Sequence, residues 1–64
     1  MTQKELLYLE DAYMHEDNTI CICSEIVELL DDENLVSFFE GEIKKHTSLR
    51  NKIMDLMEEC LNGW

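Results

Sequence analysis

The sequence predicts an all-α fold, in which a single domain spanning residues 1–64 forms an antiparallel helical hairpin that dimerises into a four-helix bundle. The chain has no proline, and its only glycines are Gly41 and Gly63, so few residues interrupt a helix. Two long stretches repeat apolar residues at alternate spacings of four and three, which is typical of one helix face. A single acidic cluster, residues 31–34, separates these stretches and indicates one turn.

The first helix is expected over residues 3–30. It begins with Thr2-Gln3-Lys4-Glu5, which has the spacing of a capping box between the Thr2 hydroxyl and the Glu5 carboxylate. From Leu6 onward, one face of this helix is apolar or neutral at every position except Glu16. The positions of this first seam are Leu6, Leu9, Tyr13, Glu16, Ile20, Cys23, Val27 and Leu30.

The turn is expected at residues 31–34, and the second helix over residues 33–61. Asp32 is the expected N-cap, because a carboxylate there accepts hydrogen bonds from free amides at the positive end of the helix. Asn62 and Gly63 form the expected C-terminal stop. The second apolar seam is broken at Glu42 and His46, and its positions are Leu35, Phe39, Glu42, His46, Leu49, Ile53, Leu56 and Cys60.

Self-association follows from the width of the apolar surface. Each helix would be about 40 Å long, and so short a turn makes the two helices antiparallel neighbours. A second apolar strip flanks each seam, and two helices alone cannot cover both. In a chain below roughly 70 residues, a single hydrophobic core seldom makes the folded state stable without disulfides, a metal ion or oligomerisation. We therefore expect a homodimer. The flanking strips are Leu7, Met14 and Ile26, then Val36, Ile43, Met57 and Leu61. The aromatic and methionine side chains expected in the core or dimer interface are Tyr8, Met14, Phe38, Met54, Met57 and Trp64.

Charge and cysteine content narrow the partners and the compartment. A net charge of −10 argues against nucleic acid and anionic membranes as partners. We find no signal peptide and no stretch long enough to span a membrane, so we expect a cytoplasmic protein. The three cysteines are expected to be reduced thiols, because Cys21 and Cys23 project in different directions from a helix. Cys23 and Cys60 fall on the seams, where cysteine acts as a small apolar residue.

The polar residues in the seams are the candidate functional site. An unpaired charge in a helical core costs several kcal/mol, so Glu16, Glu42 and His46 are expected to hold one another or a metal ion. Residues whose numbers sum to about 65 should face each other across the hairpin, so we expect no close contact between Glu16 and His46 within one chain. A two-fold partner would bring both copies to one central layer. Four-helix bundles that bind two iron or manganese ions use a comparable set of carboxylates and imidazoles.

The alternative is a layer without metal, in which Glu42 and His46 bond to each other and Glu16 reaches toward Lys45, Arg50 or solvent. His15, beside Glu16, is either a substitute metal ligand or a histidine at the edge of the bundle, and its helical direction favours the edge.

Two further sites are weak points in the helical pattern. Gly41 costs about 1 kcal/mol relative to alanine inside a helix. It is either a tolerated surface residue, or a place where a neighbouring backbone approaches or the helix distorts. Asp17, Asn18 and Thr19 are poor helix formers, so local irregularity is expected there.

The sequence contains no nucleophile beside a base, no glycine-rich phosphate loop, no zinc-type cysteine pairs and no basic stripe. We therefore expect no enzymatic activity.

Several segments taken together resemble the short clostridial relatives of the coat F family of spore coat proteins. They are residues 4–12, His15-Glu16, residues 30–35, and His46 followed by Leu49, so that the resemblance covers nearly the whole chain. It implies a ferritin-like fold and a structural protein made in the mother cell and placed in the spore coat. Glu16 and His46 match the family's glutamate on helix 1 and histidine on helix 2, and Glu42 matches an acidic position. Residues 32–34 read Asp-Glu-Asn where many relatives resemble Asp-Pro-Glu.

Three hypotheses follow. The first is a self-associating structural protein of the spore coat, which contacts other coat proteins and needs no cofactor. The second is a ferritin-like protein that binds iron or manganese through Glu16, Glu42 and His46. The third is an acidic helical adaptor for another protein.

Overall fold

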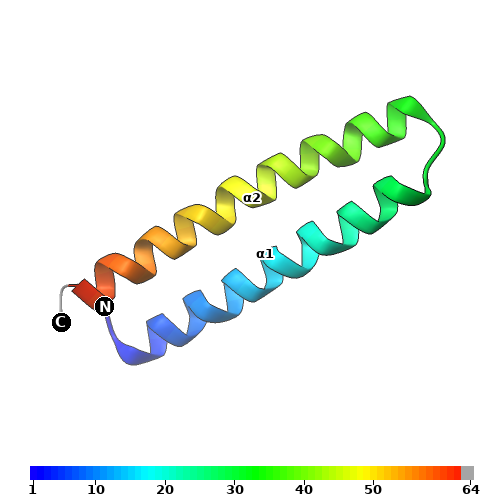
Figure 1. The fold of residues 1–64 in the computed structure, drawn as a ribbon. Helices are drawn as coiled ribbons and strands as arrows, with labels where there is room; N and C mark the ends of the chain where they lie inside the picture. Colours follow the sequence, from blue (N-terminus) through cyan, green and yellow to red (C-terminus); the bar gives the residue numbers. More distant parts are fainter. Residues whose placement is uncertain (63–64) are drawn as a thin grey trace.

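The computed structural model describes residues 1–62 as two helices, α1 (Gln3–Leu29) and α2 (Glu33–Asn62), and these residues contain no strand. The helices run antiparallel and side by side, with the connection at one end and the N-terminus at the other (Figure 1). The hairpin measures 49 × 14 × 11 Å along its principal axes. Every helix end lies within one residue of its predicted position. The stop expected at Gly63 and the core position expected for Trp64 lie outside the described residues.

The capping box predicted at the start of α1 is confirmed. The backbone amide of Glu5 donates to the Thr2 hydroxyl at 3.1 Å, and the backbone amide of Thr2 donates to the Glu5 carboxylate at 2.9 Å. The hydrogen bonds from Thr2, first from its backbone and then from its side chain, hold the pKa of Glu5 below its ordinary value of 4.5. The capping box of Thr2 and Glu5 therefore determines where α1 begins.

The predicted cap of α2 is also confirmed. A carboxylate oxygen of Asp32 accepts from the backbone amides of Asn34 at 2.8 Å and Leu35 at 3.2 Å. Two of the amides that a helix start leaves without partners are thus satisfied by one side chain.

The first seam faces α2 as predicted, since each of its eight residues is half-buried or buried. The prediction of the second seam is wrong at three positions. Leu35, Leu49 and Leu56 are 47, 39 and 45 % exposed. Their places toward α1 are taken by a neighbouring row, which we had assigned mostly to the flanking strip. This row consists of Val36, Ile43, Arg50 and Met57. The rotation of α2 brings Arg50 against α1, where its guanidinium contacts Asp17 at 2.6 Å and lies 5.9 Å from the centre of the Tyr13 ring.

Both weak points in the helical pattern are continuous helix. Residues 17–19 lie within the unbroken α1, and the Thr19 hydroxyl donates to the His15 carbonyl at 3.0 Å. Local hydrogen bonding of this kind lets threonine occupy a helix interior. Gly41 is exposed within α2, and an added Cβ there would meet no atom within 4 Å. Within one hairpin, the surface interpretation of Gly41 is confirmed and the close-approach interpretation is wrong.

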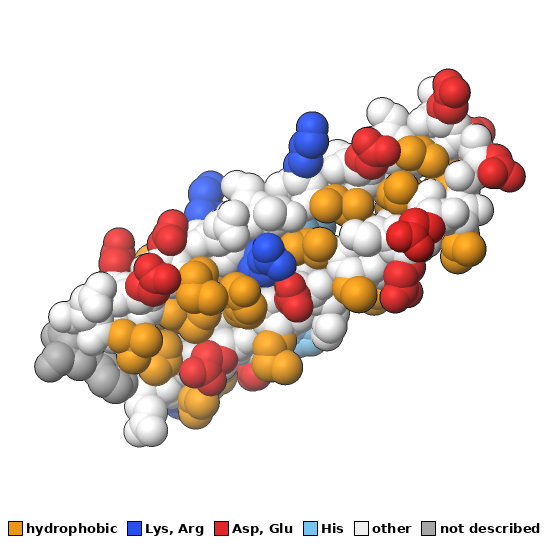
Figure 2. All heavy atoms as spheres, in the orientation of Figure 1, with side chains coloured by type: hydrophobic (Ala, Val, Ile, Leu, Met, Phe, Trp, Pro, Cys, Tyr) orange, Lys and Arg blue, Asp and Glu red, His pale blue; other side chains and the backbone are white. Residues whose placement is uncertain are grey.

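The hairpin has a very thin core. Among residues 1–62 only Cys23 and Cys60 are buried, at 8 and 7 % exposure, and no side chain is less than 2 % exposed. Both are free thiols, as is the exposed Cys21. Figure 2 shows hydrophobic side chains along the line between the helices, with acidic side chains spread over both. Two helices pressed together along one line leave every apolar side chain partly in contact with water.

Candidate functional site

Glu16, Glu42 and His46 meet near the middle of the hairpin. The Nδ1 atom of His46 on α2 contacts a carboxylate oxygen of Glu16 on α1. Its Nε2 atom lies 3.4 Å from a carboxylate oxygen of Glu42, one turn earlier on α2. A single imidazole thus lies between two carboxylates, and all three residues come from one chain.

This geometry overturns the prediction that Glu16 and His46 do not approach each other within one chain. That prediction placed Glu16 level with Leu49 and let the two side chains lean apart. In the structure, His46 keeps its predicted place in the seam, while the rotation of α2 turns Leu49 to the flank. Both side chains are long enough to close the remaining offset, and a charge-assisted hydrogen bond between them outweighs their rotamer preferences.

The burial of the three side chains makes their pairing matter for stability. The side chains of His46 and Glu16 are each 22 % exposed, and that of Glu42 is 32 % exposed. A neutral imidazole has only one N–H, so His46 donates to both carboxylates only as the imidazolium ion. The arrangement is a compact cluster of one imidazole and two carboxyl groups that is partly screened from water.

The predicted metal ligands are therefore together, but they bind one another. Within residues 1–62 of one chain, no three side chains of His, Cys, Asp or Glu are placed to hold a metal ion. A metal ion takes the lone pair of a neutral imidazole nitrogen, so it would replace at least one of the two contacts of His46. Metal binding by this layer stays a prediction, and it requires rearrangement or ligands from a second chain.

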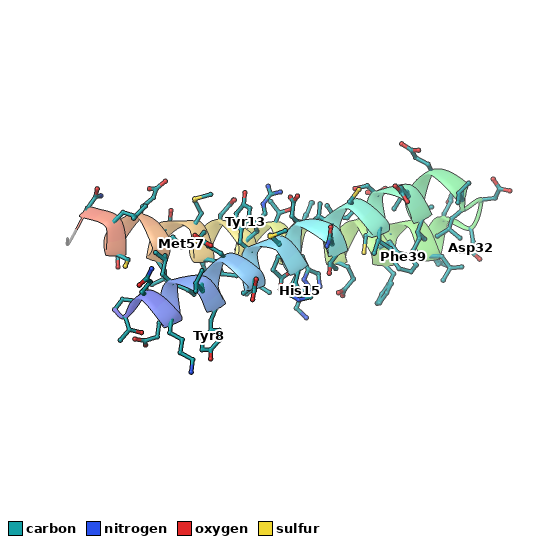
Figure 3. The ribbon with its side chains drawn as sticks, turned by 90° about the horizontal axis from the view of Figure 1, so that it is seen from below. Tyr8, Tyr13, His15, Asp32, Phe39 and Met57 are labelled. Carbon is teal, nitrogen blue, oxygen red and sulfur yellow. The ribbon has the colours of Figure 1, made fainter. Side chains whose placement is uncertain are left out.

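His15 lies outside the cluster. It is exposed, in agreement with the edge position predicted for it. Figure 3 shows His15 on the same side of the hairpin as Tyr8, opposite to the side on which Tyr13 and Met57 project.

Sequence reasoning missed the partner of Arg50. We had named Arg50 as one possible partner of Glu16, whereas Arg50 pairs with the neighbouring Asp17. Arg50 continues the spacing of seven from Val36 and Ile43, but a charge on that row is no signal that the row faces α1. The partner of Arg50 therefore could not be identified from the sequence pattern.

Comparison of the chain with protein-family models, with curated proteins and with solved structures found no match in any of the three. The resemblance to the coat F family stays a prediction, and the geometry of the hairpin carries the functional argument. No helix in residues 1–62 has the length and apolar character needed to cross a membrane.

Proposed function

We propose that this chain is a small structural protein that works as a pair of helical hairpins, packed together as a homodimeric four-helix bundle. The observation that supports this proposal is the thin core of the single hairpin. Only Cys23 and Cys60 are buried among the described residues, while ten large apolar side chains besides Met1 are at least 39 % exposed. Burying apolar side chains contributes about 1.5 to 3 kcal/mol each, so covering these residues is the largest source of stability open to the chain.

Sedimentation equilibrium of the tag-free chain at micromolar concentration tests this proposal. We expect a single species of twice the chain mass that retains its helical circular dichroism. A folded monomer under these conditions would contradict the proposal, and would leave the exposed apolar side chains for a different protein, as in the adaptor hypothesis.

The resemblance to the coat F family suggests that the bundle is a component of the spore coat, made in the mother-cell cytoplasm and in contact with other coat proteins. The sequence has no evident catalytic group, which agrees with a structural role in the coat. An antibody against the chain should then detect it in coat extracts of purified spores and not in vegetative cells. Detection in vegetative cells alone would refute the coat assignment and leave the dimer untouched.

A second candidate function is metal binding of the ferritin-like type, favoured by the meeting of Glu16, Glu42 and His46. Two hairpins would bring four carboxylates and two imidazoles to one layer, and these groups suit iron or manganese. Elemental analysis of the dimer, purified without chelator and exposed to ferrous iron without oxygen, tests this function. One or two ions per dimer, lost in a Glu16→Leu/His46→Leu variant, would support it. Equal metal content in the variant would refute it.

A further inference from the structure

One side of the hairpin carries a second, unpaired apolar row on each helix. On α1 the row is formed by Tyr8, Ile22 and Leu29, which differ by multiples of seven and therefore lie along one line of the helix. Their exposures are 59, 56 and 83 %. His15 is the polar member of the same row, and Figure 3 shows Tyr8 and His15 projecting to one side.

On α2 the matching row is formed by Leu35, Leu49 and Leu56, which are also separated by multiples of seven. These are the leucines that the rotation of α2 turned away from the seam. Glu42 is the polar member of this row. Tyr8 and Leu56 line one shallow groove together with Leu9, which places the rows of α1 and α2 on the same side of the hairpin. We call this side the apolar face.

The apolar face carries a small part of the charge of a strongly acidic chain. Along its two rows and the lines beside them, the helices carry five acidic and three basic side chains, a net charge of −2. These are Glu5, Asp11, Glu25, Glu42, Glu59, Lys4, Lys45 and Lys52. The opposite side, which presents Leu7 and Met14, carries six acidic side chains and one basic side chain, a net charge of −5. These are Glu10, Asp17, Glu28, Glu33, Glu40, Glu58 and Lys44.

The apolar face therefore carries less of the chain's net charge of −10 than the opposite side does. A second acidic copy meets less like-charge repulsion when it approaches this face than when it approaches the opposite side.

The area available matches that of a stable interface. The hairpin exposes 5006 Å², whereas a compact monomer of its 7.6 kDa mass exposes about 4,300 Å². The excess is about 700 Å², and a standard interface buries about 800 Å² on each partner. The broad side, 49 Å long and 14 Å wide between Cα extremes, is large enough to supply that area.

We infer that the apolar face is where a second copy of this chain binds. This inference rests on the proposed homodimer and specifies its geometry. Each row has apolar residues toward both ends and a polar residue near the middle, His15 on α1 and Glu42 on α2. A second copy with the same pattern covers apolar ends with apolar ends and brings a second Glu42 toward the central polar layer. The acidic side carrying Leu7 and Met14 remains in solvent.

Two double variants on α1 test the inference, because α1 offers matched pairs of exposed apolar residues on its two sides. Tyr8→Lys/Ile22→Lys alters the apolar face at residues that are 59 and 56 % exposed. Leu7→Lys/Met14→Lys alters the opposite side at residues that are 54 and 63 % exposed. Each variant changes the net charge by the same amount, so a general charge effect is shared.

We expect the dissociation constant of the dimer, measured by sedimentation equilibrium, to rise at least about 100-fold in Tyr8→Lys/Ile22→Lys, because central apolar anchors dominate an interface. It should change less than about threefold in Leu7→Lys/Met14→Lys. Equal weakening by both variants, or greater weakening by the second, would overturn the assignment of the face. If loss of helical circular dichroism obscures the first variant, the single substitutions Ile22→Gln on the apolar face and Met14→Gln on the opposite side give the same comparison with less disturbance. A monomeric wild-type chain would instead refute the proposed function itself.

Discussion

Replacing His46 with leucine isolates the energetic role of the central cluster. The substitution leaves Glu16 and Glu42 next to the space that the imidazole filled, without their shared partner. Removing one partner of a fully buried ion pair costs about 3 to 5 kcal/mol, whereas exposed pairs contribute below about 1 kcal/mol. The side chains here are 22 to 32 % exposed, so we expect His46→Leu to lower the free energy of unfolding by about 2 kcal/mol.

Glu16→Leu is expected to behave differently. His46 keeps Glu42 as a partner, and the new leucine completes the first seam, so the free energy of unfolding should change by less than about 0.5 kcal/mol or increase. Urea unfolding followed by circular dichroism, at one fixed protein concentration, measures both variants. Glu10→Leu is the control, because Glu10 is exposed on the side opposite to the apolar face and none of the ion pairs among residues 1–62 includes it. If His46→Leu and Glu16→Leu lower the free energy of unfolding equally, or if His46→Leu does not lower it, the stabilising role of one imidazole between two carboxylates is refuted.

Three further predictions concern the helices. Gly41→Ala should raise the free energy of unfolding by about 1 kcal/mol in urea titrations, because the added Cβ meets open space. A loss of stability would mean that another backbone packs against Gly41. Asp17→Asn should change stability by less than about 0.5 kcal/mol in the same assay, since Asp17 is 58 % exposed; a cost above 1 kcal/mol would show that its pair with Arg50 is not an ordinary surface pair. The folded-state pKa of Glu5 is depressed, so the stability from its capping box is present above the unfolded pKa and is lost as pH falls through the folded value. Thr2→Val should therefore speed amide exchange in the first turn of α1 at pH 6 more than at pH 3, and an equal effect at both pH values would contradict this account.

The fold was predictable because its determinants are local. Capping at Thr2 and Asp32, the absence of proline and the spacing of apolar residues define both helices without reference to the partner helix. The first seam was predictable for the same reason, since the row of Leu6, Tyr13, Ile20 and Val27 is the one row of α1 that is apolar along its whole length.

The rotation of α2 was not predictable from its apolar pattern. The rows beginning at Leu35 and Val36 are both largely apolar, so periodicity alone does not choose between them. The choice depends on the packing of the two helices as a whole, in which Arg50 contacts Asp17 and Tyr13. The candidate site illustrates the same limit. Sequence reasoning identified its three residues and offered the contact between Glu42 and His46, but it predicted wrongly that Glu16 and His46 do not meet within one chain.

Ionic strength separates an apolar interface from one held by ion pairs. Each chain carries a net charge of −10, so pairing two chains brings like charge together over a molecule 49 Å long. The Debye length falls from about 30 Å at 0.01 M salt to about 10 Å at 0.1 M, which screens this repulsion. If an apolar face holds the copies together, salt weakens only the repulsion. The dissociation constant should then fall by about threefold or more over this range, measured by sedimentation equilibrium. If Lys45 and Lys52 instead held the partner through carboxylates, screening would weaken the attraction and the dissociation constant would rise. A rise would therefore contradict binding through the apolar face, even if the chain is a dimer.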